Sequence, residues 1–176
     1  MVYICDKMKE EGVRRVKEKL YIGVIGGSYD IPKKEREKAF ELGKLIAEEG
    51  WIILCGGGGG IMEEVSRGAS EKGGTVIGIL PGSSRAEGNR FLTYALPTAL
   101  GAFRNFLIAQ ASDIIVALEG KYGTLSEVAI ALRLGKTVIS LAGWELGRRG
   151  FKADGIYEAS SPKEAVDLIK KHLIGG

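Results

Sequence analysis

The sequence has few of the residues from which metal sites, disulfide frameworks and nucleic-acid surfaces are built. Its 176 residues include one histidine and two cysteines, and the net charge is only +3. Cys5 and Cys55 both lie in apolar runs and indicate no disulfide framework, and the lone His172 cannot build a metal cluster. No basic stripe interleaved with aromatic residues indicates a nucleic-acid partner. We therefore expect no metal, no other cofactor and no nucleic acid.

Long hydrophobic runs are absent as well. No apolar stretch approaches the roughly eighteen residues of a membrane span, and no signal peptide opens the chain. The composition, 45% hydrophobic and 27% charged, is ordinary for a globular protein. We therefore expect a cytoplasmic protein with no membrane partner. The length fits one domain at 21–176, preceded by a charge-rich peripheral extension at 1–20 that carries no motif.

Short apolar runs alternate with helical stretches along the rest of the chain. The runs are rich in β-branched residues, are bounded by glycine or proline and lack polar alternation, which is typical of strands buried on both faces. They lie at 21–25, 51–55, 75–80, 114–118 and 137–141, with a sixth at 155–159. Helices are expected at 32–49, 61–72, 98–112, 124–134 and 162–173. This order predicts an α/β fold, a Rossmann-like doubly wound parallel sheet in three α/β/α layers, with ligands bound outside the carboxyl ends of the strands.

Glycine is abundant, with 27 residues gathered in a few places. Three glycine turns, at 26–28, 56–60 and 120–124, follow predicted strands and lead toward helices. Tight turns need glycine in any case, but exposed amides at a helix start also attract anions, and missing Cβ atoms let a phosphate approach. Because all three turns fall at one sheet edge, we predict a phosphate or nucleotide site. Its predicted residues are Gly26, Gly27, Ser28, Gly57, Gly58, Gly59, Gly120, Lys121, Tyr122, Gly123 and Thr124.

Two familiar nucleotide motifs are excluded. The dinucleotide fingerprint is absent after the first strand, and the second strand ends at Cys55 without an acidic residue for a ribose hydroxyl. The segment 135–137 reads Gly-Lys-Thr like the end of a P-loop, but Ile130 stands at the leading glycine and a strand follows. An ordinary NAD enzyme or P-loop enzyme is therefore not expected.

The connection at 81–97 is long for a compact α/β domain. It contains Arg85, Asn89 and Arg90, with a short strand expected at 91–95, and it leaves a strand at its carboxyl end. Connections of this length are often functional, so it is either a lid over the site or a plain surface loop.

Glu127 admits two interpretations. Thr124 and Glu127 have the spacing of a capping box, in which the two side chains bond to backbone amides at a helix start. Ser161 and Glu164 show the same spacing before the last helix, without a glycine turn. By spacing alone, Glu127 is therefore a capping residue, whereas its apolar surroundings make it a candidate catalytic group.

The helices at 98–112 and 124–134 are apolar nearly all round, which indicates burial in the core or between subunits. A homodimer, or a dimer of dimers, is therefore the expected assembly. Arg104 and Glu127 are set in these helices, and buried charges are costly unless they are paired. They form either a structural ion pair or part of a polar pocket, with Arg104 facing a phosphate and Glu127 facing a sugar.

The ordered set of Gly-Gly-Ser, the 56–60 glycines, Arg104-Asn105 and the 120–127 segment resembles the LOG (Lonely Guy) superfamily, long mislabelled as lysine decarboxylases, and its molybdenum-cofactor carrier-like branch. LOG enzymes cleave the N-glycosidic bond of nucleoside 5′-monophosphates, releasing base and ribose 5-phosphate. Of their signature P-G-G-x-G-T-x-x-E, the matching residues here are Gly120, Gly123, Thr124 and Glu127. By this resemblance Glu127 would stabilise the oxocarbenium-like sugar or orient water, while Arg104 would hold the substrate.

The resemblance makes a nucleoside 5′-monophosphate phosphoribohydrolase the first expectation. Two departures from the LOG pattern motivate an alternative to it. Glu119-Gly120-Lys121 stands where the family has Pro-Gly-Gly, and Asn105 stands where a lysine follows the arginine. The alternative is a non-catalytic carrier or sensor of a phosphorylated nucleotide or molybdopterin-type ligand. No lysine stands in a convincing pyridoxal-phosphate setting, so lysine decarboxylase activity is not expected.

Overall fold

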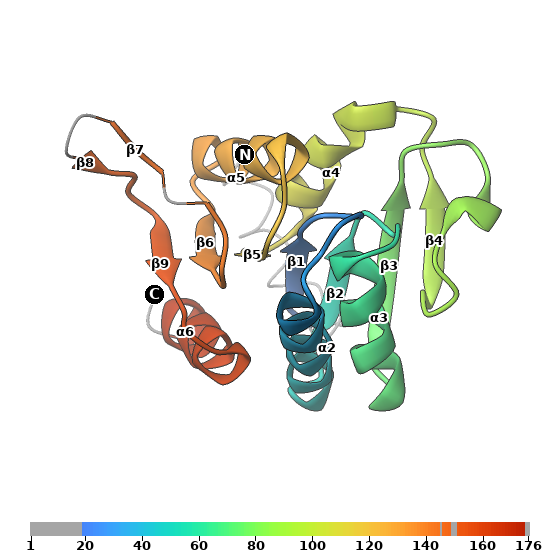
Figure 1. The fold of residues 1–176 in the computed structure, drawn as a ribbon, viewed down its shortest axis with the longest axis horizontal. Helices are drawn as coiled ribbons and strands as arrows, with labels where there is room; N and C mark the ends of the chain where they lie inside the picture. The colour runs from blue at the N-terminus through green and yellow to red at the C-terminus, as the bar shows by residue number, and fades with distance from the viewer. Residues whose placement is uncertain (1–18, 145, 149–150, 175–176) are drawn as a thin grey trace, which may run out of the picture.

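The computed structural model describes residues 19–144, 146–148 and 151–174. Its main sheet has seven strands in the order β4-β3-β2-β1-β5-β6-β9, and every neighbouring pair is parallel (Figure 1). The strands are β1 (Tyr21–Ile25), β2 (Ile52–Cys55), β3 (Thr75–Leu80), β4 (Tyr94–Pro97), β5 (Ile114–Ala117), β6 (Thr137–Ser140) and β9 (Ile156–Glu158). The predicted doubly wound parallel α/β fold is confirmed.

The helices form two groups on the sheet. The first comprises α2 (Lys33–Glu48), α3 (Ile61–Glu71) and α6 (Pro162–Ile174), and the second comprises α4 (Arg104–Ala111) and α5 (Tyr122–Arg133). Helix α2 packs against both α3 and α6, whereas α4 packs against α5, and the two groups lie well apart in Figure 1. Successive residues of β5 enter opposite cores, Ile114 beside the first group and Ile115 beside the second. Both faces of a strand are therefore apolar, which explains the unalternating runs in the sequence.

The strand order places a topological switch point between β1 and β5. From β1 the chain builds β2, β3 and β4 outward on one side, then crosses to β5, β6 and β9 on the other. Ile25 at the end of β1 pairs with Ala117 at the end of β5, so the turns that follow these two strands leave the sheet side by side. In open α/β sheets this crevice is where ligands bind.

The segment before α4 differs from the prediction of a helix over 98–112. The α-helix begins only at Arg104, after a 3₁₀ turn, η2 (Gly101–Phe103). Ala99 and Gly101 have φ values of 55° and 53°, in the left-handed region, so no continuous right-handed helix can pass through them. The predicted strand at 91–95 lies instead at Tyr94–Pro97, and Arg85–Glu87 form a short 3₁₀ turn, η1.

Helix α5 begins at Tyr122, two residues before the predicted start, and this overturns the capping-box interpretation of Glu127. Its N-cap residue is Lys121, and no side chain caps the helix. Thr124 and Glu127 thus lie inside the helix. At α6, by contrast, the Ser161 hydroxyl does accept a hydrogen bond from the Glu164 amide (3.2 Å).

The structure does not test the predicted N-terminal extension, and it adds a strand pair that was not predicted. The expected extension at 1–20 lies almost entirely outside the described residues, as does Cys5. An antiparallel pair, β7 (Gly147–Arg148) with β8 (Phe151–Lys152), was not expected from the sequence. Within the described part of the chain, none of the helices combines the length and apolar character needed to cross a membrane.

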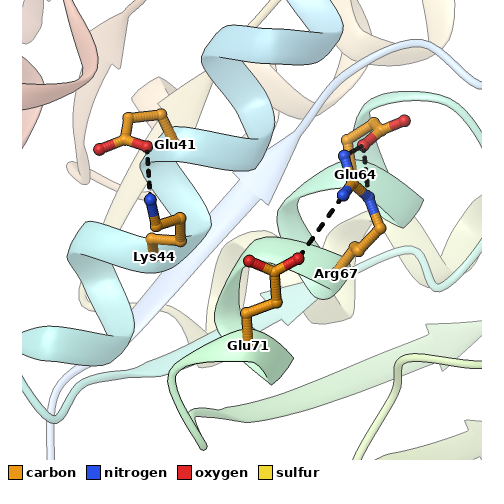
Figure 2. Close-up of polar contacts among 5 residues, drawn as sticks. All are labelled: Glu41, Lys44, Glu64, Arg67 and Glu71. Atoms are coloured by element: carbon orange, nitrogen blue, oxygen red, sulfur yellow. Dashed lines mark hydrogen bonds and ion pairs between the residues drawn. The ribbon is translucent and has the colours of Figure 1, made fainter.

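The solvent-exposed surface of α2 and α3 carries several ion pairs. Figure 2 shows Lys44 paired with Glu41 on α2, and Arg67 paired with both Glu64 and Glu71 on α3. Such pairs between neighbouring turns of one helix contribute little to stability. This surface lies away from the switch point and carries none of the predicted site residues.

Candidate functional site

The three predicted glycine turns meet at the carboxyl edge of the sheet and hydrogen-bond to one another. The Gly27 amide donates to the Glu119 carbonyl (2.7 Å), and the Ile61 amide donates to the Gly27 carbonyl (2.9 Å). The turn after β1 therefore bridges the turns after β2 and β5. Contact is so close that a Cβ on Gly60 would overlap the Gly27 carbonyl oxygen.

A cavity of about 260 Å³ opens where these turns meet. Among the predicted ligand-binding residues, it is lined by Gly26, Gly27, Ser28, Gly120, Lys121, Gly123 and Thr124. Arg104 and Glu127 also line it, together with Asn105 and Gly56. Gly57, Gly58 and Gly59 do not, and neither does Tyr122, whose side chain is 80% exposed.

The start of α5 is the part of this cavity that is best suited to an anion. No side chain caps its first-turn amides, and no acidic residue stands in its first turn. The helices α2, α3 and α6 all carry glutamate there. The partial positive charge at the α5 N-terminus is therefore unopposed by its own first turn, and Lys121, Gly123 and Thr124 present it to the cavity.

Arg104 and Glu127 form an ion pair on the cavity wall. Arg104 Nη1 lies 3.0 Å from Glu127 Oε1, and the side chains are 14% and 8% exposed. Burial raises the pKa of Glu127 to about 7, although the Arg104 charge acts in the opposite direction. Arg104 Nε is buried and has no hydrogen-bond partner among the residues that the structure describes, so it is an unsatisfied donor at the site. The structure thus forms the ion pair that the sequence allowed and places it on a cavity wall, while contacts of Arg104 with a phosphate and of Glu127 with a sugar stay predictions.

Neighbouring groups hold this pair in place. A Cβ on Gly56 would overlap the guanidinium of Arg104, so glycine is required for the side chain to lie across the end of β2. Asn105 Nδ2 donates to Ser126 Oγ (3.1 Å), which in turn donates to the Gly123 carbonyl (2.6 Å). The residue that replaces the family's lysine therefore ties α4 to the first turn of α5.

The residues predicted as a possible lid do not line this cavity. Asn89 instead fastens the second glycine turn: its Nδ2 donates to the carbonyls of Gly57 (3.2 Å) and Gly58 (3.0 Å). Arg85 is exposed in η1, and the guanidinium of Arg90 lies 4.8 Å from the centre of the Phe91 ring. The connection after β3 thus braces the glycine turn from outside the cavity.

The rim carries exposed charges of both signs. Lys121 Nζ lies 3.7 Å from Asp30 Oδ2, and both side chains are more than 80% exposed. Glu119, exposed on the same rim, also lines the cavity. Asp30 was not predicted as a site residue, although its place directly after the first glycine turn was a usable signal.

Trp144 is the aromatic residue that the sequence analysis missed at this edge. Its Nε1 donates to the Gly120 carbonyl (3.0 Å), and its ring lies 6.2 Å from that of Tyr122, tilted by 31°. It follows β6, the strand next to β5, so its position at a fourth carboxyl end was the signal that could have found it.

Comparison with known proteins places the chain in a family. Residues 19–167, most of the chain, match the SLOG cluster4 family. The chain belongs to that family. An uncharacterized protein of Archaeoglobus fulgidus is 38% identical over 148 residues, covering 84% of this chain and 93% of its own length.

Solved structures show the same fold over nearly the full length. The molybdenum cofactor binding protein of Rippkaea orientalis is 36% identical with a TM-score of 0.83, covering 89% of this chain and 99% of its own. The Moco carrier protein of Chlamydomonas reinhardtii is 35% identical with a TM-score of 0.81, covering 90% and 100%. A rice protein named "Probable cytokinin riboside 5'-monophosphate phosphoribohydrolase" is 36% identical over 106 residues, 58% of this chain and 47% of its own length. The chain thus spans about half of that relative. The predicted resemblance to the LOG superfamily and its molybdenum-cofactor carrier-like branch is confirmed.

Proposed function

We propose that this protein binds a small phosphorylated ligand, a nucleoside monophosphate or a molybdopterin-type compound, in the cavity at the switch point. The observation that carries the proposal is the uncapped start of α5, which opens into a cavity with Arg104 and Glu127 on its wall. A phosphate there accepts hydrogen bonds from first-turn amides and meets the positive end of the helix. Lys121 adds a cationic side chain on the rim.

A carrier or storage role is the function that we favour. The likeness to the molybdenum cofactor binding and carrier proteins covers about nine-tenths of this chain and almost all of theirs. The likeness to the rice phosphoribohydrolase covers about half of each chain. Glu119-Gly120-Lys121 also departs from the hydrolase signature at the turn that faces the ligand.

Substitutions at Gly123 test phosphate binding directly. A Cβ on Gly123 meets no atom within 4 Å, so an alanine fits there and the side chain of an aspartate starts in open space. We expect Gly123→Asp, which places a carboxylate in the first turn of α5, to weaken binding of AMP and ribose 5-phosphate at least tenfold. Gly123→Ala adds no charge, so its affinity should stay within about threefold of that of the unmodified protein. A tenfold loss corresponds to about 1.4 kcal/mol. Isothermal titration calorimetry measures both; equal affinities for the two variants, or no binding by the unmodified protein, would overturn the proposal.

A second candidate function is nucleoside monophosphate hydrolysis, and the state of Glu127 favours it. A buried carboxyl with a pKa of about 7 beside Arg104 is in the range where a group exchanges protons near neutral pH. In this mechanism the Glu127 carboxylate stabilises positive charge developing on the sugar or orients the attacking water, while the phosphate stays at α5. The products are free base and ribose 5-phosphate.

Chromatographic assay of base release from a panel of nucleoside monophosphates tests hydrolysis. We expect Glu127→Gln to lower the rate by about 100-fold or more, as for other residues that stabilise a transition-state charge. The variant should retain AMP binding, which separates a chemical role from a binding role. Absence of base release from every nucleotide in the panel leaves carriage as the function.

We also propose that the protein forms a homodimer through an apolar face shared by α4 and the η2 turn before it, called here the apolar face of α4. This face exposes large apolar side chains beside the cavity, with Phe103 at 84%. Its members are Leu100, Phe103, Phe106 and Leu107. An apolar patch next to a ligand site is typical of a protein–protein interface. A second copy on this face would cover the apolar side chains of α4 that the described part of the chain leaves exposed.

A further inference from the structure

We propose that a second cavity, between the turns after β5 and β6, receives the planar nitrogen heterocycle of the ligand, which stacks on Trp144. The inference rests on the proposed binding function, because the phosphate at α5 brings the heterocycle to this place. The cavity measures about 280 Å³ and is lined by Glu119, Gly120, Ala142, Gly143 and Trp144. Glu119 and Gly120 also line the first cavity, so the two cavities adjoin at the turn after β5, and we propose that one ligand spans this turn.

The Trp144 ring is held in a fixed orientation. Its Nε1 donates to the Gly120 carbonyl, and the Gly143 amide beside it donates to Ser140 Oγ (3.2 Å). Ala142 has a φ of 66°, a left-handed conformation that is costly for a residue with a side chain. Strained backbone of this kind persists where surrounding contacts hold it and is concentrated at ligand sites. A ring that is already fixed loses little conformational freedom when a ligand stacks on it.

The groups around Trp144 suit a purine or a pterin. Tyr122, with its exposed ring 6.2 Å from that of Trp144, starts the helix proposed to bind the phosphate. Aromatic side chains that are apolar on their faces and polar at one end bind planar heterocycles by stacking. Glu119 supplies a carboxylate that accepts hydrogen bonds from amino and ring N–H groups. The negative charge of this carboxylate is unfavourable beside a phosphate but favourable beside the N–H groups at the edge of such a heterocycle.

Two substitutions separate stacking from the structural role of Trp144. Trp144→Phe and Trp144→Leu both lose the hydrogen bond to Gly120, but only phenylalanine keeps an aromatic face. We expect Trp144→Phe to bind AMP within about threefold of the unmodified protein, whereas Trp144→Leu loses about tenfold or more, the low end of measured base-stacking effects. Ribose 5-phosphate, which has no heterocycle, should bind both variants equally. Calorimetry measures all of these affinities.

Fluorescence gives a second readout in which Trp144 itself is unchanged. In the Trp51→Phe protein Trp144 is the remaining tryptophan, and AMP should quench its emission while ribose 5-phosphate leaves it unchanged. Equal AMP affinities for Trp144→Phe and Trp144→Leu, or no quenching at saturating AMP, would overturn the inference and leave the phosphate site standing. If neither AMP nor ribose 5-phosphate binds the unmodified protein, the proposed function fails as well.

Discussion

Arg104 on α4 and Glu127 on α5 pair at 3.0 Å, with both side chains largely buried and both lining the switch-point cavity. The pair links the two helices of one sheet face at the wall of this cavity. Burial still keeps the pKa of Glu127 near 7, because the low-dielectric surroundings disfavour its charged form more than Arg104 favours it. The site therefore holds a carboxyl group that changes charge near neutral pH.

This shift makes stability depend on pH. Because the pKa of Glu127 is about 7 in the folded protein and near 4.5 in the unfolded chain, the folded state binds the extra proton between these values. The free energy of unfolding should fall as the pH rises from 5 to 8. Glu127→Gln removes this dependence, so its stability relative to the unmodified protein should improve over that interval by up to about 3 kcal/mol. Urea denaturation at pH 5, 6, 7 and 8 measures the change.

Arg104→Gln should strengthen the pH dependence of stability that Glu127→Gln removes. It leaves Glu127 buried without its cationic partner, so the pKa of Glu127 should rise further and the loss of stability should extend to higher pH. Parallel pH curves for the unmodified protein and the two variants would contradict the assignment of the shift to burial of Glu127.

A side chain at Gly56 should move Arg104. A Cβ there overlaps the guanidinium of Arg104, so Gly56→Ala must displace the arginine from the cavity wall. We expect AMP affinity to fall about tenfold, equivalent to about 1.4 kcal/mol. Gly59→Ala is the matched control in the same turn, since its nearest atom is 3.6 Å away. Calorimetric titration should show the loss at position 56 and little change at 59.

Asn89 should determine how firmly the second glycine turn is held. Asn89→Ala removes the side-chain hydrogen bonds to the carbonyls of Gly57 and Gly58. The Gly57 carbonyl still accepts a hydrogen bond from the backbone amide of residue 89, but the Gly58 carbonyl loses its side-chain donor. Leaving a polar group without its partner costs about 1–3 kcal/mol. Amide hydrogen exchange across 56–60, followed by mass spectrometry, should therefore accelerate severalfold. Arg85→Ala in the same connection, exposed in η1, should leave these rates unchanged; acceleration in both would count against a specific role for Asn89.

The proposed dimer makes a prediction about one exposed side chain. Phe103→Glu places a charge in the apolar face of α4, where a desolvated carboxylate without a partner is unfavourable. Sedimentation velocity should show the dimer dissociating to a monomer at micromolar concentration. Tyr94→Glu, at an exposed aromatic on the edge strand β4, is the control and should not dissociate it. A monomer for the unmodified protein would remove the dimer from the proposal.

Much of the sheet was predictable because local chemistry and topology agree there. The run at 75–80 is β-branched and bounded by glycine and proline, and it forms β3 with those bounds. A parallel arrangement then brings the glycine turns to one edge without further information. Their hydrogen bonds, such as Gly27 to Glu119, follow from strand order and could be expected once β1 and β5 were placed side by side.

Backbone detail and distant hydrogen bonds were not predictable in this way. Ala99 adopts a left-handed conformation that local sequence opposes, so the helix at 98–112 was drawn too long. Thr124 carries a capping-box spacing, yet its hydroxyl sits where a Cβ on Gly120 would be, one turn inside the helix. Asn89 and Trp144 act through partners 24 or more residues away, and local pattern contains no information on such pairs.

The bridging position of Gly27 has a consequence for how long a ligand stays bound. One residue's amide and carbonyl hold together segments that lie more than thirty and about ninety residues away along the chain. A partly unfolded molecule that has lost β5 or α3 thus has no pocket at all. Binding of the proposed ligand should slow local unfolding of these segments as much as global unfolding. Resistance of the whole domain to proteases should therefore increase with the fraction of protein that has ligand bound. A protein molecule cleaved in one of the segments joined by Gly27 should release a bound ligand in a single step.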